Sequence, residues 1–157
     1  GWRGKPWQAA YGKQHAMGVA LHRSFGSIVA QVAEVSLGTG NIPVVHKVWC
    51  AVDCGFAVNP LLVPMQIESA IAYGLSATLH EEIVIRDGRA SNGNFDDYPV
   101  LTPAEMPDVD VAIINSGEKM GGIGEVGTPP IAPAVCNALF TLTGNRIRTL
   151  PINARST

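Results

Sequence analysis

The chain has 157 residues, of which 46% are hydrophobic and 15% are charged, and its formal net charge is −2. This length suffices for one domain with a hydrophobic core, and the composition is that of a globular protein. The weak net charge and the lack of any run of Lys or Arg exclude a basic nucleic-acid surface, and no apolar stretch reaches the ~18–20 residues of a membrane span. We therefore expect a single domain over residues 1–157, with a weakly charged surface that another domain or subunit covers.

The cysteines and histidines give no sign of a protein-ligated metal. Cys50 and Cys54 are separated by three residues, but no second pair completes a zinc site. We therefore interpret them, and Cys136, as small buried hydrophobic side chains. The histidines also lack metal-ligand spacing. Since the chain begins at Gly1 without an initiator Met, we expect it to be a piece of a longer polypeptide.

Two β-rich segments follow an N-terminal stretch, residues 1–17, which shows no hydrophobic period and is expected to be irregular. Along Ser27–Val35 the side chains alternate between a fully buried face and a mixed face, as in a strand packed on a core. Val44–Val52 is a second such run, and the Gly- and Asn-containing segment 38–41 connects the two. The pattern predicts an antiparallel hairpin.

A helix is predicted to begin near Pro64, because apolar side chains recur in the segment after it at every fourth position. These side chains are Ile67, Ile71 and Leu75. Beside them runs a stripe of small residues that would let another element pack closely, namely Ala70, Gly74 and Ala77. Gln66 would then lie in the first helical turn, with its amide near the free N–H groups of the helix start.

The remaining segments complete the expected fold. They are a strand at Glu81–Ile85, a turn at 86–89, an irregular segment at 91–107, a strand at Asp110–Asn115 and a helix from about Pro130 to Thr143 that stops at Gly144. Together the segments predict an α+β fold, with a mixed or antiparallel sheet, an N-terminal hairpin and two main helices.

A glycine-rich loop that contains one carboxylate, Glu125, precedes the last helix. Glycines at 121, 122, 124 and 127 permit positive φ and close approach of the backbone to a ligand. Thr128 is a candidate N-cap and Pro129 suits the first turn, whose free N–H groups would favour an anion. Two interpretations have about equal weight on these residues alone: a ligand site that includes Glu125, or a helix-capping loop with a solvated Glu125.

Other polar residues in loops are interpreted as structural. Asp53 and Asn59 are expected to hold the entry to the first helix, and the segment 96–99 is typical of a turn. His46 lies within a strand and is expected to be a half-exposed sheet residue.

A series of short motifs then occurs in one order along the chain. They are Val52-Asp53-Cys54-Gly55, Asn59-Pro60, Gln66-Ile67-Glu68, Tyr73-Gly74-Leu75, Asn94-Phe95 with Asp97-Tyr98-Pro99, Glu105-Met106-Pro107, the run from Gly122 to Pro133, and the ending from Thr143 to Ile152. This order resembles the C-terminal part of the molybdenum-binding large subunit of the xanthine dehydrogenase and aldehyde oxidase family, and within it the isoquinoline 1-oxidoreductase beta-subunit type. The resemblance covers about residues 17–152, and so many ordered matches make chance a poor explanation.

The resemblance implies a molybdopterin cofactor, in bacteria often the cytosine dinucleotide, whose metal has no protein ligand. It assigns Glu125 as the general base on the Mo–OH group in hydroxylation of an N-heterocycle or aldehyde with water-derived oxygen. It assigns Gln66 a hydrogen bond near the molybdenum ligands and the pterin, and the backbone of Gly122, Ile123 and Gly124 further cofactor contacts. Electrons would pass to a [2Fe–2S] partner subunit. Burial of Glu125 would make it a stronger base.

The chain departs from the family pattern in three ways. Val126 stands where the subgroup has Pro, and Ser69-Ala70 replaces Gly-Gly after the glutamine motif. The upstream half of the subunit, with its further cofactor loops and substrate-positioning groups, is missing. We therefore expect the isolated chain to be inactive. The alternative is a non-catalytic module that binds a cofactor or partner and keeps the fold; substrate and compartment stay undetermined.

Overall fold

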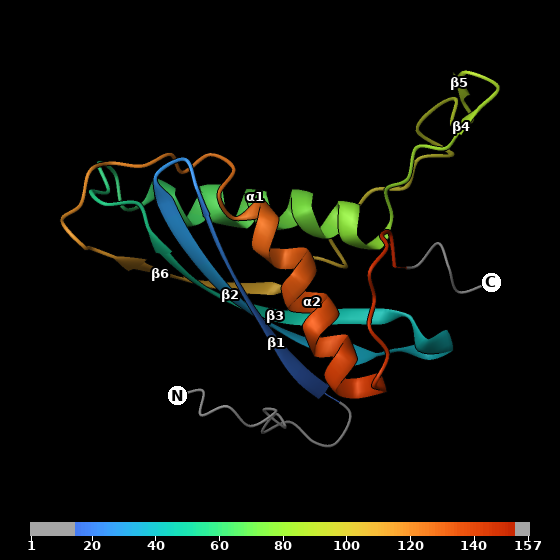
Figure 1. The fold of residues 1–157 in the computed structure, drawn as a ribbon, viewed down its shortest axis with the longest axis horizontal. Helices are drawn as coiled ribbons and strands as arrows, with labels where there is room; N and C mark the ends of the chain where they lie inside the picture. The colour runs from blue at the N-terminus through green and yellow to red at the C-terminus, as the bar shows by residue number, and fades with distance from the viewer. Residues whose placement is uncertain (1–14, 153–157) are drawn as a thin grey trace.

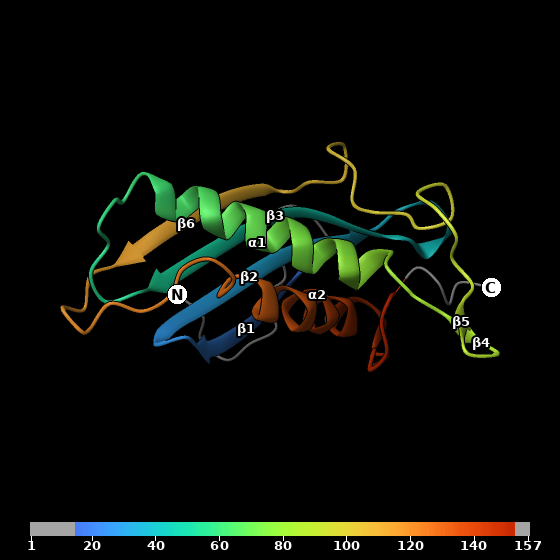
Figure 2. The ribbon, with the colours of Figure 1, turned by 90° about the horizontal axis from the view of Figure 1, so that it is seen from above.

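The computed structural model describes residues 15–152, which form a sheet with two helices packed on one of its faces (Figure 1). Figure 2 shows from above that α1 and α2 lie side by side over the same face. The elements are β1 (His15–Ser24), β2 (Ser27–Leu37), the 3-10 turn η1 (Thr39–Asn41), β3 (Pro43–Asp53), α1 (Leu62–Leu79), β4 (Ile85–Arg86), β5 (Arg89–Ala90), β6 (Asp108–Ile114) and α2 (Thr128–Thr143).

The sheet is mixed, as the sequence predicts. Its strand order is β1-β2-β3-β6, with β1, β2 and β3 antiparallel in succession and β6 parallel to β3. The predicted hairpin is confirmed as β2 and β3, and Gly40 in its turn has a φ of 72°. A parallel neighbour needs a crossover, which here contains α1. The α+β prediction is therefore confirmed.

Strand β1 was not predicted, and the segment expected to be irregular, residues 1–17, extends into it at His15. Residues 1–14 of that segment lie outside the described part. The strand was not predicted because Gly18 interrupts its apolar pattern. A Cβ at Gly18 would overlap the backbone of α2 at Ala134 and Ala138. The glycine is required because α2 crosses β1 in backbone contact.

The two helices also pack closely against each other, through the predicted stripe on α1. A Cβ at Gly74 would lie 2.7 Å from the carbonyl oxygen of Thr128 and 2.5 Å from a methyl group of Ile131. Ala70 is buried in the same contact, whereas Ala77 is exposed and does not belong to it. Two of the three predicted stripe residues thus bring α2 onto α1.

The start of α1 differs from the prediction. The helix begins at Leu62, two residues before Pro64, after the N-cap residue Leu61. Gln66 therefore lies in the second turn and not in the first. Asn59 starts the helix instead, because its Oδ1 accepts the N–H of Leu61 at 3.0 Å and its carbonyl accepts that of Leu62 at 3.1 Å.

The core lies between the helices and the sheet. Its buried members include Val29, Ala33, Val48 and Val52 from the sheet, Ile67, Ile71 and Leu75 from α1, and Ile131, Val135 and Leu139 from α2. Cys50 and Cys54 are buried as predicted, while Cys136 is only half-buried. The predicted helix end is confirmed, since Gly144 has a φ of 74° and its N–H bonds the Phe140 carbonyl.

A projecting arm that contains β4 and β5 extends beyond the end of α1 (Figure 1). The strand predicted at Glu81–Ile85 is wrong: only Ile85 and Arg86 pair, in a two-residue β4 that forms a small ladder with β5. The turn between them is confirmed at Asp87 and Gly88, which have φ values of 51° and 75°. The arm buries little apolar surface, so packing does not stabilise longer strands in it.

We predict that Gly74→Leu lowers the free energy of unfolding by about 1–3 kcal/mol or more, because the side chain would be forced into the contact between α1 and α2. Urea denaturation followed by circular dichroism measures this. Ala77→Leu is the matched control: it lies three residues further along the same helix on an exposed position, and it should change stability by less than about 0.5 kcal/mol. Equal losses in the two variants would contradict the packing described above.

Candidate active site

The glycine-rich loop connects β6 to α2 and is bonded to the β1–β2 turn. The N–H of Gly122 donates to the carbonyl of Phe25 at 2.8 Å, and its own carbonyl accepts the Ser27 hydroxyl at 2.6 Å. The N–H of Gly121 donates to the carbonyl of Cys54 at 2.9 Å, at the end of β3. Both peptide groups of Gly122 are thus occupied within the protein, so this residue holds the loop in place.

Close packing, and not a left-handed backbone, explains the first glycines of the loop. Among the described residues the glycines with positive φ are 26, 40, 55, 88, 117 and 144, and none of these is a glycine of the run 121–127. A Cβ at Gly121 would overlap the Ser27 hydroxyl and the backbone of Gly26. A Cβ at Gly122 would lie 3.0 Å from that of Phe25. The loop therefore lies directly on the β1–β2 turn.

Gln31 holds the end of the loop in place. It is a fully buried side chain in the middle of β2. Its Nε2 donates to the carbonyl of Gly127 at 2.8 Å. Its Oε1 has no hydrogen-bond partner among the described residues. Gln31 pairs with Cys50 across the sheet, where burial raises the pKa of the Cys50 thiol to about 11. A lone amide in an apolar strand was the available signal for this anchor in the sequence.

The first turn of α2 does not offer the free N–H groups that the sequence predicts. The N-cap is Gly127 and not Thr128. The N–H of Thr128 donates to the carbonyl of Glu125 at 3.0 Å, and its hydroxyl donates to the carbonyl of Ala70 at 3.1 Å. Pro129 and Pro130 have no N–H. Donors remain only before the helix, where the N–H groups of residues 123–127 have no partner within residues 15–152. Of these residues, Val126 and Gly127 are buried.

Glu125 and Gly124 form the outward part of the loop. The Glu125 side chain is exposed among the described residues, so any burial that makes it a stronger base has to come from outside residues 15–152. Gly124 is exposed as well, and a Cβ there would meet no atom within 4 Å. Its φ is not positive. Neither packing nor backbone conformation within the described chain requires a glycine at 124, which leaves open space next to the carboxylate.

The loop and α1 meet at Gly127. A Cβ at Gly127 would lie 3.0 Å from the Cβ of Ala70 and 3.4 Å from the carbonyl oxygen of Ile67. Gln66 immediately precedes Ile67, and Glu125 is two residues before Gly127. The structure thus brings together the two segments that carry Gln66 and Glu125. Both side chains are exposed, and within residues 15–152 no hydrogen bond joins them.

The other polar loop residues have structural roles, although Asp53 acts in the loop after β3 and not at the predicted entry to the first helix. Asp53 Oδ1 accepts the N–H of Gly55 at 2.9 Å and the Ser116 hydroxyl at 2.8 Å. The Asp97 carboxylate accepts the N–H groups of Gly93 and Asn94, and these bonds lower the pKa of Asp97. In the described part of the chain no group of His, Cys, Asp or Glu could hold a metal ion, and no helix is long and apolar enough to cross a membrane.

A polar cluster on the sheet face opposite the helices was not predicted. The rings of His15 and His46 stack with centroids 4.5 Å apart, and His15 Nδ1 lies 2.8 Å from Glu34 Oε1. His46 Nε2 lies 2.7 Å from the Ser36 hydroxyl. Burial, followed by the charge of His15, lowers the pKa of His46. These residues are far apart in sequence and meet only through strand register, which is why periodicity did not reveal them.

Comparison with known proteins places this geometry in a family. The model of the molybdopterin cofactor-binding domain matches residues 3–107. The beta subunit of isoquinoline 1-oxidoreductase from Brevundimonas diminuta is 36% identical over 138 residues, which is 87% of this chain and 18% of that protein. An alignment of that extent includes the glycine loop.

Two further similarities extend the comparison. A membrane-bound aldehyde dehydrogenase from Gluconacetobacter polyoxogenes, whose name includes pyrroloquinoline quinone, is 37% identical over 79% of this chain and 16% of its own length. The crystal structure of quinoline 2-oxidoreductase from Pseudomonas putida 86 superposes with a TM-score of 0.73 at 25% identity, over 80% of this chain and 17% of that one. The chain thus spans less than a fifth of the length of these relatives.

We predict that Gln31→Met frees the glycine loop. The apolar side chain has a similar length but leaves the Gly127 carbonyl buried without a donor, which costs ~1–3 kcal/mol. Hydrogen exchange read by mass spectrometry should show faster exchange in the peptide that contains Gly121 and Gly122 than in peptides of β3. As a control, Val32→Met, on the opposite face of the same strand, should leave loop exchange unchanged. Uniform acceleration in Gln31→Met would show that Gln31 supports the whole domain and not the loop.

Proposed function

The chain belongs to the molybdopterin cofactor-binding domain family, and from this membership we propose that it is part of the large subunit of a molybdenum hydroxylase. The reaction we propose is oxidative hydroxylation of an N-heterocycle or an aldehyde. The observation that carries the proposal is the anchored loop, which presents Glu125 beside the open space at Gly124.

The residues of the loop fit a cofactor of this kind. At Gly124 a Cβ would occupy open space that nothing in the described chain fills. The N–H groups of Ile123 and Gly124 are free of partners within residues 15–152, so they can donate to anionic or carbonyl oxygens of a pterin. We assign these two N–H groups and the Gln66 amide to cofactor binding. Gly122 contributes by holding the loop, because its N–H is already bonded to Phe25.

When bound, the cofactor supplies a molybdenum centre that accepts electrons from the substrate and delivers an oxygen atom that comes from water. Glu125 accepts the proton that this chemistry releases, at its exposed carboxylate. Gln66 can donate and accept at once through its amide, and so orients polar groups of the cofactor. The anchoring bonds of Gly121, Gly122 and Gly127 hold the loop backbone that carries the carboxylate, which favours the positioning that general-base catalysis requires.

The rest of the subunit completes the proposed enzyme. Because the chain is 18% of the length of the isoquinoline 1-oxidoreductase subunit, most contacts to cofactor and substrate come from outside it. We therefore propose that the isolated chain is inactive. The cytosine dinucleotide form of the cofactor and a [2Fe–2S] partner subunit as electron acceptor are also parts of the proposal.

A non-catalytic module with the same fold is the competing function, and the departures from the family pattern are its support. Val126 replaces a proline, but it is 1% exposed and packs in the core, so the loop is held without the ring. Ala70 replaces a glycine and its Cβ fits against Gly127. Neither substitution disturbs the loop, which supports the enzyme over the module.

We predict that Glu125→Gln in the complete enzyme slows turnover by ~10²–10⁴-fold, because the amide keeps the shape but cannot accept the proton. Steady-state rates should be compared at equal molybdenum content. Glu118→Gln is the control, since Glu118 is an exposed carboxylate earlier in the same connection between β6 and α2. Turnover of Glu125→Gln within about threefold of the parent enzyme would exclude Glu125 as the base.

We further predict that Gln66→Ala reduces the cofactor content of the complete enzyme without changing the thermal unfolding of the cofactor-free protein, since the side chain is exposed. Molybdenum is measured by inductively coupled plasma mass spectrometry, and pterin by fluorescence of its oxidised form. Ser69→Ala, exposed on the same helix, is the control. Full cofactor content in Gln66→Ala would remove this residue from the site. Bound pyrroloquinoline quinone in place of molybdenum would overturn the proposed function itself.

A further inference from the structure

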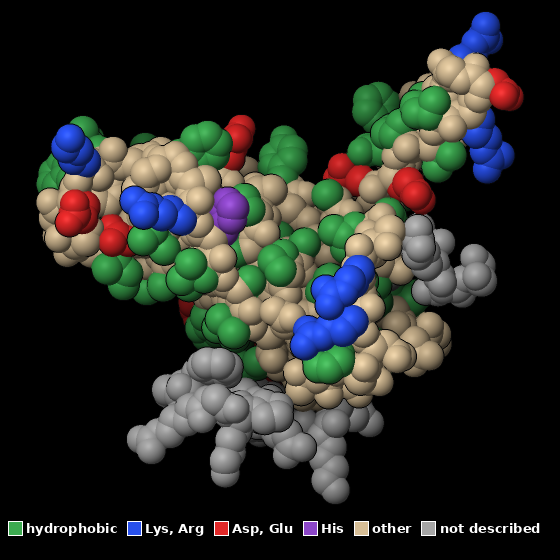
Figure 3. Space-filling view, viewed as in Figure 1, with side chains coloured by type: hydrophobic (Ala, Val, Ile, Leu, Met, Phe, Trp, Pro, Cys, Tyr) green, Lys and Arg blue, Asp and Glu red, His purple; other side chains and the backbone are tan. Residues whose placement is uncertain are grey.

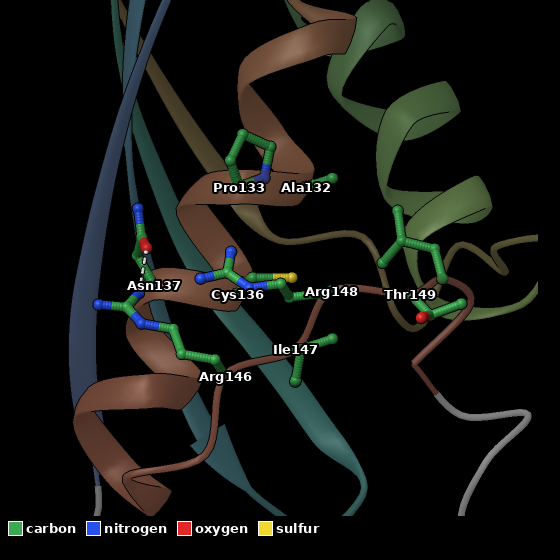
Figure 4. Close-up of a pocket in the computed structure, with 9 residues that line it drawn as sticks. Ala132, Pro133, Cys136, Asn137, Arg146, Ile147, Arg148 and Thr149 are labelled. Atoms are coloured by element: carbon green, nitrogen blue, oxygen red, sulfur yellow. Dashed lines mark hydrogen bonds between the residues drawn. The ribbon is translucent and has the colours of Figure 1, made fainter.

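A cavity lies along α2, away from the glycine loop. It has a volume of about 280 Å³, is open to solvent, and lies between α2 and the C-terminal segment, residues 144–152, that turns back along the helix. Pro133 and Cys136 of α2 and Ile147 of the C-terminal segment provide apolar lining, and Arg146 and Arg148 are also part of the wall (Figure 4). None of the residues assigned to the cofactor lines this cavity.

Arg146 is held in a fixed position. Its Nη1 donates to Asn137 Oδ1 at 2.9 Å, and its guanidinium carbon lies 3.5 Å from the centre of the Phe140 ring. Asn137 is itself oriented, because its Nδ2 donates to the carbonyl of Val19 in β1 at 3.0 Å. The guanidinium has further N–H groups beyond the one that bonds Asn137. The site therefore has a prearranged cation with unused donors.

Arg148 adds a second cation on the same side. In Figure 4 the side chains of Arg146 and Arg148 both extend from the C-terminal segment across α2. Within residues 15–152 neither forms an ion pair with a carboxylate. On the face in Figure 3, basic side chains gather over the lower part of α2, while acidic ones lie over other elements. The wall of the cavity thus has two cations without a carboxylate partner in the described part of the chain.

The walls of the cavity are tied to the rest of the domain. The N–H of Ile152 donates to the carbonyl of Thr78 at the end of α1, at 2.8 Å. Gly144 closes α2 and reverses the chain, so that the arginines face the helix they follow. Pro151 is buried. The C-terminal segment is thus fixed at both ends, which gives the cavity a defined shape.

We propose that this cavity binds a small organic anion, whose phosphate or carboxylate oxygens accept hydrogen bonds from Arg146 and Arg148 and whose apolar body lies against Pro133, Cys136 and Ile147. Guanidinium groups match the geometry of such oxyanions and bind them in a bidentate manner. Burial raises the pKa of the Cys136 thiol, so the lining beneath the arginines remains neutral and does not repel an anion. The inference is independent of the function proposed for the glycine loop.

Isothermal titration of the 157-residue protein with phenyl phosphate, benzoate and inorganic phosphate tests the proposal. Phenyl phosphate or benzoate should bind once per chain, with a dissociation constant below about 1 mM. Inorganic phosphate should bind at least about fivefold more weakly than phenyl phosphate, since it has no apolar body. Benzyl alcohol, the neutral control, should not bind. Comparing phosphate with carboxylate identifies the preferred oxyanion.

Substitutions of single arginines test whether the anion binds in this cavity. Arg148→Gln should weaken binding at least about tenfold, and Arg148→Lys should weaken it less, because the charge remains but the bidentate donor is lost. Arg86→Gln, an exposed arginine on β4, is the control and should bind like the parent protein. Circular dichroism verifies folding, which Arg148 is not expected to affect because it is exposed. No saturable binding of phenyl phosphate or benzoate up to about 10 mM, or equal weakening in Arg86→Gln, would overturn the proposal.

Discussion

The position of α2 depends on two backbone contacts that only glycine permits. Gly18 of β1 and Gly74 of α1 face α2 from two sides, and a Cβ at either would overlap it or press into it. Because α2 lies so close to both elements, the loop that precedes it packs directly on the β1–β2 turn. The same close packing explains Gly121, whose Cβ would overlap Ser27. Gly124 and Glu125, the outward part of the loop, therefore project from a closely packed backbone.

The hydrogen bonds of the loop divide it into an anchored part and an available part. Gly121, Gly122 and the Gly127 carbonyl are bonded to the protein, and the first turn of α2 has two prolines and an N–H that is already donated. A helix N-terminus ordinarily attracts anions through its free N–H groups. Here those groups are removed or occupied, so the available donors lie at residues 123–125. This arrangement moves the potential ligand contacts from the helix to the loop, next to Glu125.

Periodicity was sufficient to predict the hairpin, β6, both helices and the α+β class, because each of these elements has a strong apolar period. It failed for β1, where Gly18 interrupts the period for a reason that only α2 reveals. The same limit applies to the site. The motifs indicated Glu125 and Gln66, but Gln31 holds the loop through a contact 96 residues away in sequence, and no local pattern predicts such a contact. The start of α1 was misplaced because Pro64 was taken as the first turn, while Asn59 begins the helix further upstream.

The charges at the two ends of α2 have the signs that its dipole favours. Glu125 precedes the N-terminus by three residues, and Arg146 follows the last helical residue by three. Neither residue lies within a terminal turn of the helix, so the interaction of these exposed charges with the dipole is weak. The dipole accounts for the signs but not for the structure around them. Two observations are not explained by the dipole. Asn137 holds Arg146 while it is itself bonded to β1, and open space at Gly124 lies beside a carboxylate on an anchored loop. Those features, and not the dipole, are the grounds for proposing a cofactor site beside Glu125 and a small-anion site along α2.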